Sequence, residues 1–246
     1  MKPAAHLFVA LLICAGCKKD DATIKPGAPA ALELLAVHST VVPEPSGLAY
    51  FKKHNTLLTV SDANSTVYEL GFDGSIQRSL KVASSDLEGI AVSVTGDTLF
   101  VASEASRSID SYLWDGTRTG SLPTGIEGDA NHGPEGVALD TRQQHLFVIN
   151  EKNPRLLLEF AHGVEVARYE IDLSGDLSDI FYEAESDCLW IVSDESASVL
   201  KLSRTGSLKA EYSLPFNKGE GITILRDTLY IINDADGKLY AFKKPS

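Results

Sequence analysis

Three glutamates in this sequence recur in nearly the same short phrase, each followed by glycine and then by an apolar run. They are Glu88 in "DLEGIAV", Glu135 in "GPEGVAL" and Glu220 in "GEGITI". Two related phrases carry serine at the same position, Ser46 and Ser178. Carboxylates brought together near one axis repel one another unless a cation or a proton lies between them. The three glutamates are therefore candidate ligands of one shared cation.

A second set of acids closes the apolar run that follows each phrase. These runs read "LLTVSD", "LFVASE", "LFVINE", "LWIVSD" and "LYIIND", and the closing acids are Asp62, Glu104, Glu151, Asp194 and Asp234. An acid at a strand end can accept hydrogen bonds from turn amides, which is a structural alternative to metal binding. A role required by the fold would place an acid at this position in every repeat, as the sequence does. The structural and the metal-binding interpretations therefore both stay open.

Both sets of phrases belong to one repeated unit. The residue after each glutamate or serine stands at positions 47, 89, 136, 179 and 221, at intervals of 42, 47, 43 and 42 residues. Each unit holds short strand patterns separated by glycine-containing turns such as "FDGS" and "RTGS". Four short strands at this period are typical of a propeller blade. We predict an all-β fold, a single five-bladed β-propeller over residues 31–246, with residues 31–38 completing the last blade. Six blades are the alternative.

Propeller geometry predicts where the acids converge. The first strand of each blade lines the central channel, so a group at its start lies at a channel mouth. The end of the antiparallel second strand lies on the same face. A site made of oxygen ligands favours Ca²⁺, and no histidine or cysteine spacing indicates zinc. The predicted metal ligands are Glu88, Glu135, Glu220, Glu104, Glu151 and Asp194.

The longest interval between repeats places extra residues in the loop "GIEGDANHGPEG", 125–136, on the same face. His132 in this loop is the candidate catalytic residue, as a general base, but it could also bind a ligand or be a polar loop residue. Basic residues that follow second-strand acids should surround the mouth and would suit an anionic ligand, with solvated loop charges as the alternative. The predicted ligand-binding residues are Asp129, Asn131, His132, Arg107, Lys152 and Arg155.

The N-terminal segment predicts export and a lipid anchor. Residues 1–16 contain one early lysine, Lys2, and an apolar run too short to span a bilayer. The run ends in Ala-Gly-Cys and resembles the signal peptide of bacterial lipoproteins, in which the cysteine, here Cys17, is lipidated. Residues 17–30 follow as a polar tether. We expect a membrane-anchored protein of the cell envelope, at the outer membrane or the cell surface.

The net charge limits which partners the protein can bind, and the cysteine content limits its disulfide bonds. Loss of residues 1–16 removes Lys2 and leaves 21 basic against 34 acidic residues, a formal charge of −13. Such a field repels phosphate backbones, which argues against nucleic acid and favours cations. With Cys17 lipidated, Cys188 is the one remaining cysteine, so we expect no intramolecular disulfide. We expect a monomer that binds a small-molecule or protein ligand.

Several phrases together resemble the SdiA-regulated family of bacterial exported propellers. They include "EPSGLAY", "GPEGVALDTRQQHLFVINEKNPRLLLEF" and "DLSDIFYEAESDCLWIVSDESASVLKL", and the similarity runs over roughly residues 31–243. The resemblance implies a cell-envelope propeller whose biochemical activity is not established. The Glu-Gly phrases also resemble the metal-binding glutamates of calcium-dependent lactonase and phytase propellers, a local likeness that transfers no activity.

Three functional hypotheses follow. The first is a binding or interaction module with Ca²⁺ at the channel mouth, because the sequence has no nucleophile elbow and no phosphate-binding loop. The second is a Ca²⁺-dependent hydrolase of phosphoesters or lactones, in which His132 or a glutamate takes the proton from water. The third is a purely structural envelope protein.

Overall fold

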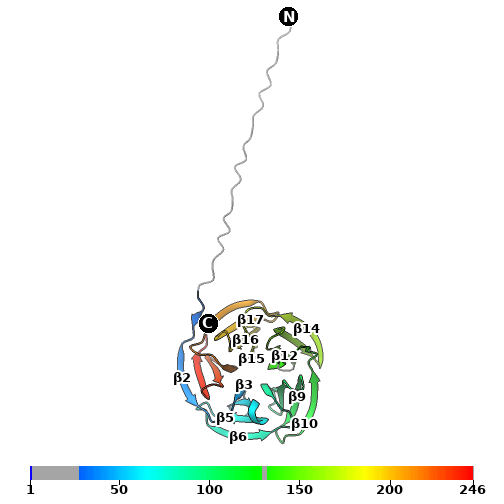
Figure 1. Cartoon of the computed structure of the whole chain (residues 1–246), viewed down its shortest axis with the longest axis vertical. Helices are drawn as coiled ribbons and strands as arrows, with labels where there is room; N and C mark the ends of the chain where they lie inside the picture. Colours follow the sequence, from blue (N-terminus) through cyan, green and yellow to red (C-terminus); the bar gives the residue numbers. More distant parts are fainter. Residues whose placement is uncertain (2–27, 129–131, 246) are drawn as a thin grey trace.

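Five β-sheets are arranged in a ring around a central axis (Figure 1). The computed structural model describes residue 1, residues 28–128 and residues 132–245. Four sheets have four strands each, and the remaining sheet has a short fifth strand at its edge. In these described ranges the single helical element is a 3₁₀ turn, η1 (Asp62–Asn64), and no helix is long and apolar enough to cross a membrane. The prediction of a five-bladed, all-β propeller is confirmed.

In blades 1 to 4 the four strands follow one another in the chain from the central axis outwards, as do the three inner strands of blade 5 (Figure 1). Blade 1 consists of β3 (Pro45–Phe51), β4 (Thr56–Ser61), β5 (Thr66–Leu70) and β6 (Ile76–Lys81). Blade 2 consists of β7 (Leu87–Val92), β8 (Thr98–Ser103), β9 (Ser108–Leu113) and β10 (Arg118–Pro123). Blade 3 consists of β11 (Pro134–Asp140), β12 (His145–Asn150), β13 (Leu156–Ala161) and β14 (Val164–Glu170). Blade 4 consists of β15 (Asp179–Glu183), β16 (Cys188–Ser193), β17 (Ser198–Ser203) and β18 (Leu208–Ser213). Blade 5 contains β19 (Gly219–Leu225), β20 (Thr228–Asn233) and β21 (Lys238–Lys243).

The ring closes through an N-terminal strand, β2 (Leu34–Ser39). This strand pairs antiparallel with β21 and forms the outer strand of blade 5, as expected from the missing fourth strand of the last repeat. It begins at Leu34 rather than at residue 31, because β1 (Ala30–Ala31) pairs in parallel with β18 of blade 4. The N-terminal segment therefore bonds to two neighbouring blades.

Burial decreases from the inner to the outer strands. The second strand of blade 4, β16, is buried along its whole length, whereas the outer strands β6 and β10 are mostly exposed. The core lies between blades, as in the cluster of Trp190, Ile222 and Phe242 that joins blades 4 and 5. Because each blade covers an apolar face of the next, the whole ring holds the inner strands in place.

The inner strands approach one another most closely at a ring that we term the waist, formed by Gly47, Gly89, Gly136, Asp179 and Gly221. A Cβ atom at Gly89 would lie 2.6 Å from the carbonyl oxygen of Glu135. A Cβ atom at Gly221 would lie 2.6 Å from the carbonyl carbon of Gly47. Backbones this close leave no room for a side chain, which is why the repeated phrase carries glycine.

Asp179 takes the place of glycine in blade 4 and lies across the channel. The residue is fully buried, and its Oδ2 accepts hydrogen bonds from the amides of Leu48 in blade 1 (3.0 Å) and Ile222 in blade 5 (2.8 Å). Burial raises the pKa of Asp179 well above its usual range, although these amide donors lower it. Its carboxyl group thus links three blades. Two cavities with no lining residue in common lie at the two ends of the channel.

Candidate functional site

The cavity at the end where the inner strands begin is lined mainly by acids, and we term it the acidic mouth. Its volume is about 330 Å³. Lys218 is the one basic residue among the described residues that line it. All six predicted metal ligands line this cavity, as the repeat geometry predicted. Further acids there are Glu44, Asp62, Asp176 and Asp234.

A β-bulge directs the repeated glutamate into the acidic mouth. In blade 2, residues 87 and 89 pair with consecutive residues of β8, so Glu88 is an extra residue in the ladder. The same register shift occurs at Glu135 in β11 and at Glu220 in β19. A bulged residue leaves the regular ladder, and its side chain takes a new direction. The Glu-Gly phrase therefore produces a bulge, followed by the glycine of the waist.

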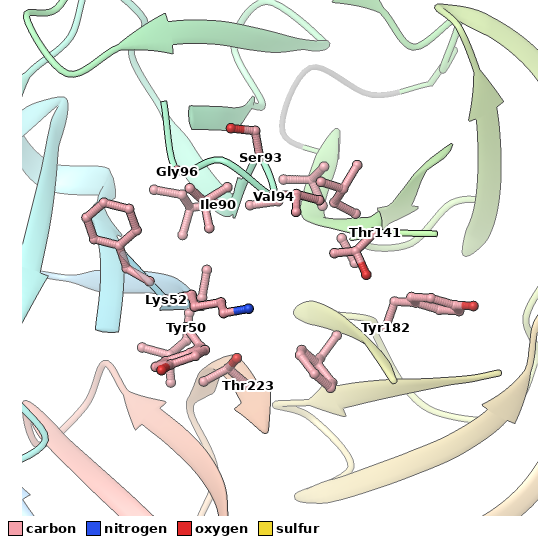
Figure 2. Close-up of a pocket in the computed structure, with 18 of the residues that line it drawn as sticks. Tyr50, Lys52, Ile90, Ser93, Val94, Gly96, Thr141, Tyr182 and Thr223 are labelled. Carbon is pink, nitrogen blue, oxygen red and sulfur yellow. The ribbon is translucent and has the colours of Figure 1, made fainter. Parts of the chain in front are cut away.

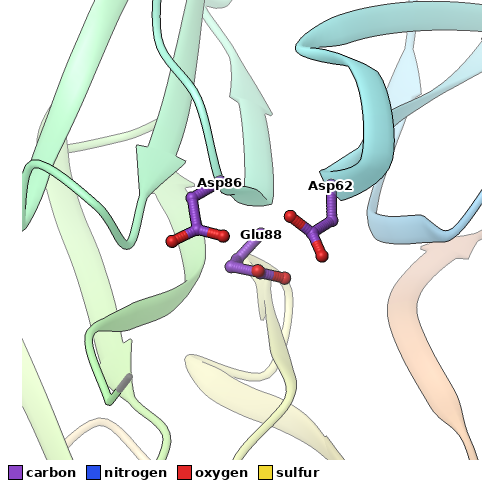
Figure 3. Close-up of side chains that lie close together, drawn as sticks. All are labelled: Asp62, Asp86 and Glu88. Carbon is purple, nitrogen blue, oxygen red and sulfur yellow. The ribbon is translucent and has the colours of Figure 1, made fainter. Parts of the chain in front are cut away.

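The most compact group of carboxylates lies between blades 1 and 2 (Figure 3). Asp62, Asp86 and Glu88 each offer one carboxylate oxygen, and these three oxygens lie within 4.8 Å of one another. Asp62 begins η1 directly after β4, Glu88 is the bulge of β7, and Asp86 precedes β7 with a φ of 59°. Ca²⁺ takes six to eight oxygen ligands, many of them from carboxylates. This group, which we term the three-carboxylate cluster, fits such an ion.

Crowding raises the pKa values of the acids around this cluster. Burial and the neighbouring Asp62 raise the pKa of Glu88 to about 8. Burial, together with the neighbouring Asp86, raises the pKa of Asp62 to about 6 and that of Glu104 to about 7. For Glu135, burial and the charge of Glu88 raise the pKa well above its usual range. The side chains here share negative charge that a bound cation would compensate.

On the opposite side of the acidic mouth, lysines compensate the negative charge of the carboxylates. Lys218 Nζ lies 2.7 Å from Asp194 Oδ2 and 3.6 Å from Glu220 Oε1. Lys152 Nζ lies 2.6 Å from Glu151 Oε1. Three of the six predicted metal ligands thus already have ammonium partners. The other three have no lysine or arginine partner in the described part of the chain: Glu88, Glu104 and Glu135.

Two of the predicted ligand-binding residues hold loops instead of lining the acidic mouth. Arg107 donates hydrogen bonds to the carbonyl oxygens of Ile126 (3.2 Å) and Gly128 (2.8 Å). Arg155 donates to two carbonyl oxygens of the loop 171–175, each at 3.1 Å. Both guanidinium groups thus fix the chain that leads into the next blade.

Two other residues of this predicted set lie against Glu151. His132 Nε2 is 4.0 Å from a carboxylate oxygen of Glu151. Lys152 contacts both Glu151 and Glu195, the latter at 2.9 Å. Neither His132 nor Lys152 lines the acidic mouth itself. Asp129 and Asn131 lie outside the described residues.

One further ring of residues was not identified from the sequence, and three of its members, Glu44, Asp176 and Lys218, line the acidic mouth. Its members stand two positions before each inner-strand glutamate or serine: Glu44, Asp86, Gly133, Asp176 and Lys218. Asp86 completes the three-carboxylate cluster, whereas Lys218 compensates the opposite side. The repeat spacing contained this signal, because the ring has the same period as the bulged glutamates.

A family model described as SdiA-regulated matches residues 24–214 and again residues 160–245. The chain belongs to the SdiA-regulated family. The resemblance read from the blade-specific phrases is thereby confirmed over most of the chain.

Solved structures share the fold of this SdiA-regulated protein. A gluconolactonase from Xanthomonas campestris matches with a TM-score of 0.57 and 15% identity, over 90% of this chain and 99% of that one. A luciferin-regenerating enzyme matches with a TM-score of 0.55 and 12% identity, over 86% and 97%. A virginiamycin B lyase from Staphylococcus aureus matches with a TM-score of 0.52 and 15% identity, over 82% of this chain and 66% of that one. At these identities the likeness concerns the propeller fold alone.

Proposed function

We propose that this SdiA-regulated propeller is a Ca²⁺-dependent ligand-binding module of the cell envelope, anchored to a membrane through a lipidated Cys17. The three-carboxylate cluster carries the proposal. Its side chains, Asp62, Asp86 and Glu88, lie within 4.8 Å of one another and have no lysine or arginine partner among the described residues. A group of carboxylates this close is stable when a cation lies between them.

The ligand would bind next to the metal. One oxygen from each of the three carboxylates gives three ligands, fewer than the six to eight that Ca²⁺ takes, so second carboxylate oxygens, water or ligand oxygens would complete the shell. The remaining volume of the acidic mouth admits a small molecule with oxygen donors, such as a carboxylate, a phosphate or a polyol. A ligand with such donors would gain affinity from Ca²⁺ and lose it when the metal is removed.

Calorimetric titration of EDTA-treated protein with CaCl₂ tests the metal site. We expect Asp86→Asn to weaken binding by about tenfold or more, because it removes one charged ligand. Asp194→Asn is the matched control, since Asp194 lines the same cavity but is paired with Lys218, and it should change affinity far less. The proposal is wrong if the wild type does not bind Ca²⁺, or if both variants lose affinity equally.

A Ca²⁺-dependent hydrolase is the second candidate, favoured by the position of Glu104 beside the three-carboxylate cluster. Bound Ca²⁺ would supply polarisation of a substrate oxygen. Glu104 also lines the acidic mouth, where its carboxylate could take a proton from a water molecule beside the ion. Assays with lactones and phosphate monoesters test this candidate. Turnover that needs Ca²⁺ and is lost in Glu104→Gln supports it, whereas Ca²⁺ binding without turnover leaves the binding module as the function.

A further inference from the structure

The opposite end of the channel holds a second cavity of different chemistry (Figure 2). Its volume is about 360 Å³, and it lies where the inner strands end. The waist and the carboxyl group of Asp179 stand between this cavity and the acidic mouth. Its lining is mainly apolar and includes Ile90, Val94 and Val137.

Small side chains create the space in this cavity. Two residues after the waist, blades 1, 2 and 3 carry Ala49, Ala91 and Ala138, whereas blades 4 and 5 carry Phe181 and Thr223. The three alanines leave room at the axis that larger residues would fill. The volume falls in the range of pockets that hold small organic ligands, which are mostly apolar with a few polar groups.

The polar groups of this cavity favour an anion. Lys52 is exposed at the cavity, and Figure 2 shows its ammonium group directed over the centre. Lys53 is paired with Asp97 at 2.6 Å, whereas Lys52 forms no ion pair with any described residue. The described residues that line the cavity include no aspartate or glutamate. In a chain with a formal charge of −12, this end of the channel is a locally positive, apolar site.

Thr223 adds a buried polar group to the wall. Its side chain is fully buried, and its Oγ1 has no hydrogen-bond partner in the part of the chain that the structure describes. A buried hydroxyl group without a partner is unfavourable, and cores usually avoid it. This hydroxyl oxygen is closed off from solvent, so it lies within the wall behind the cavity surface, and Lys52 remains the polar group that a ligand can reach.

We propose that this cavity is a second binding site, which takes a small amphiphile with an apolar chain and an anionic head group. The chain would lie against the alanines and the apolar wall, and the head group would pair with Lys52 at the open end. The site is independent of Ca²⁺, because the waist separates it from the three-carboxylate cluster.

Calorimetric titration with sodium octanoate and with 1-octanol tests the site. We expect saturable binding of one octanoate per chain, tighter than binding of octanol. Lys52→Gln should weaken octanoate binding about three- to fivefold, the size of an exposed ion pair, and leave octanol binding unchanged. Lys81→Gln, at an exposed lysine of the outer strand β6, is the matched control and should change neither. Octanoate binding that is absent, or equal in wild type and Lys52→Gln, overturns the proposal.

A second variant locates the binding in the cavity. Ala138→Phe fills the space between the inner strands and should abolish binding of both probes, whereas EDTA treatment and Asp86→Asn should leave it intact. Circular dichroism and thermal melting check that the variant folds, and Lys52→Gln decides the outcome if it does not. Undiminished octanoate binding to folded Ala138→Phe overturns the proposal. Loss of binding on removal of Ca²⁺ would instead place the probe in the acidic mouth and also overturn it.

Discussion

The acids between blades 1 and 2 are held close together in a partly buried cavity, where ionised carboxylates are unfavourable. Burial and the charges of neighbouring acids together raise the pKa of Glu88 to about 8 and that of Glu104 to about 7. Glu104 Oε1 is buried without a hydrogen-bond partner among the described residues. Groups in this state reduce the stability of the metal-free protein, and a cation held between them would restore it.

The raised pKa values make the stability of the metal-free protein depend on pH. Between about pH 4.5 and 8, these glutamates are more fully protonated in the folded state than in the unfolded chain. The free energy of unfolding therefore falls as the pH rises through this window. We expect the melting temperature in EDTA to be several degrees higher at pH 5 than at pH 8, since about 1 kcal/mol moves it by about 2–4 °C in a domain of this size.

Substitution of Glu88 checks the origin of this pH dependence. Glu88→Gln removes one of the acids with a raised pKa, so the difference in melting temperature between pH 5 and pH 8 should shrink. Glu185→Gln, at an exposed position outside the acidic mouth, should leave the difference unchanged. A metal-free protein that is more stable at pH 8 than at pH 5 would contradict the assignment.

The repeat in the sequence identified most acids of the acidic mouth, but it did not show which of them are paired with a lysine. Glu151 and Asp194 match Glu104 in repeat position, yet each has an ammonium partner and Glu104 has none. The pairing of Asp194 depends on Lys218, which approaches from the next blade. Contacts of this kind form only when the ring closes, so the pattern within one repeat cannot predict them.

The inner strands place these side chains through two linked features, a bulge and a glycine. The bulge moves Glu88 out of the ladder, and the next residue, Gly89, contacts the backbone of blade 3 at the waist. The strand pattern predicted the four strands of each blade because apolar alternation is visible in sequence. It did not predict the bulge, because one extra residue leaves that pattern almost unchanged.

Substitution at the waist tests this close approach. A Cβ atom at Gly89 would lie 2.6 Å from the carbonyl oxygen of Glu135, so Gly89→Ala must push two inner strands apart. We expect a loss of about 1–3 kcal/mol in the free energy of unfolding, measured in urea, which is the usual effect of overpacking. Gly120→Ala in β10 is the control, because its nearest contact is Ser111 Oγ at 3.9 Å, and it should be close to neutral. Equal stability of the two variants would show that the waist is not tightly packed.

The propeller as a whole has two unlike ends. One end carries the acidic mouth, and the other carries the apolar cavity with Lys52. The count of repeats predicted the closed ring, and the acids predicted the first end. The second end depends on Ala49, Ala91 and Ala138, which read as ordinary strand residues until the ring brings them around one axis.

Membrane attachment is tested on the intact chain. Because the apolar segment ends in Ala-Gly-Cys, Cys17→Ser should prevent lipidation and release the protein from the membrane fraction into the soluble envelope fraction. Cys188→Ser, at the buried cysteine of β16, is the control and should stay with the membranes. A Cys17→Ser variant that remains in the membrane fraction would contradict lipid anchoring through this residue.

The location of a bound ion tests the proposed Ca²⁺ site most directly. Crystals grown in CaCl₂ and measured at a long wavelength give an anomalous difference map in which calcium is a strong scatterer. We expect the strongest protein-bound peak between the carboxylates of Asp62, Asp86 and Glu88, and its loss in Asp86→Asn. A map with no peak in the acidic mouth, or with the ion on the side of Lys218 and Asp194, would contradict the proposed site.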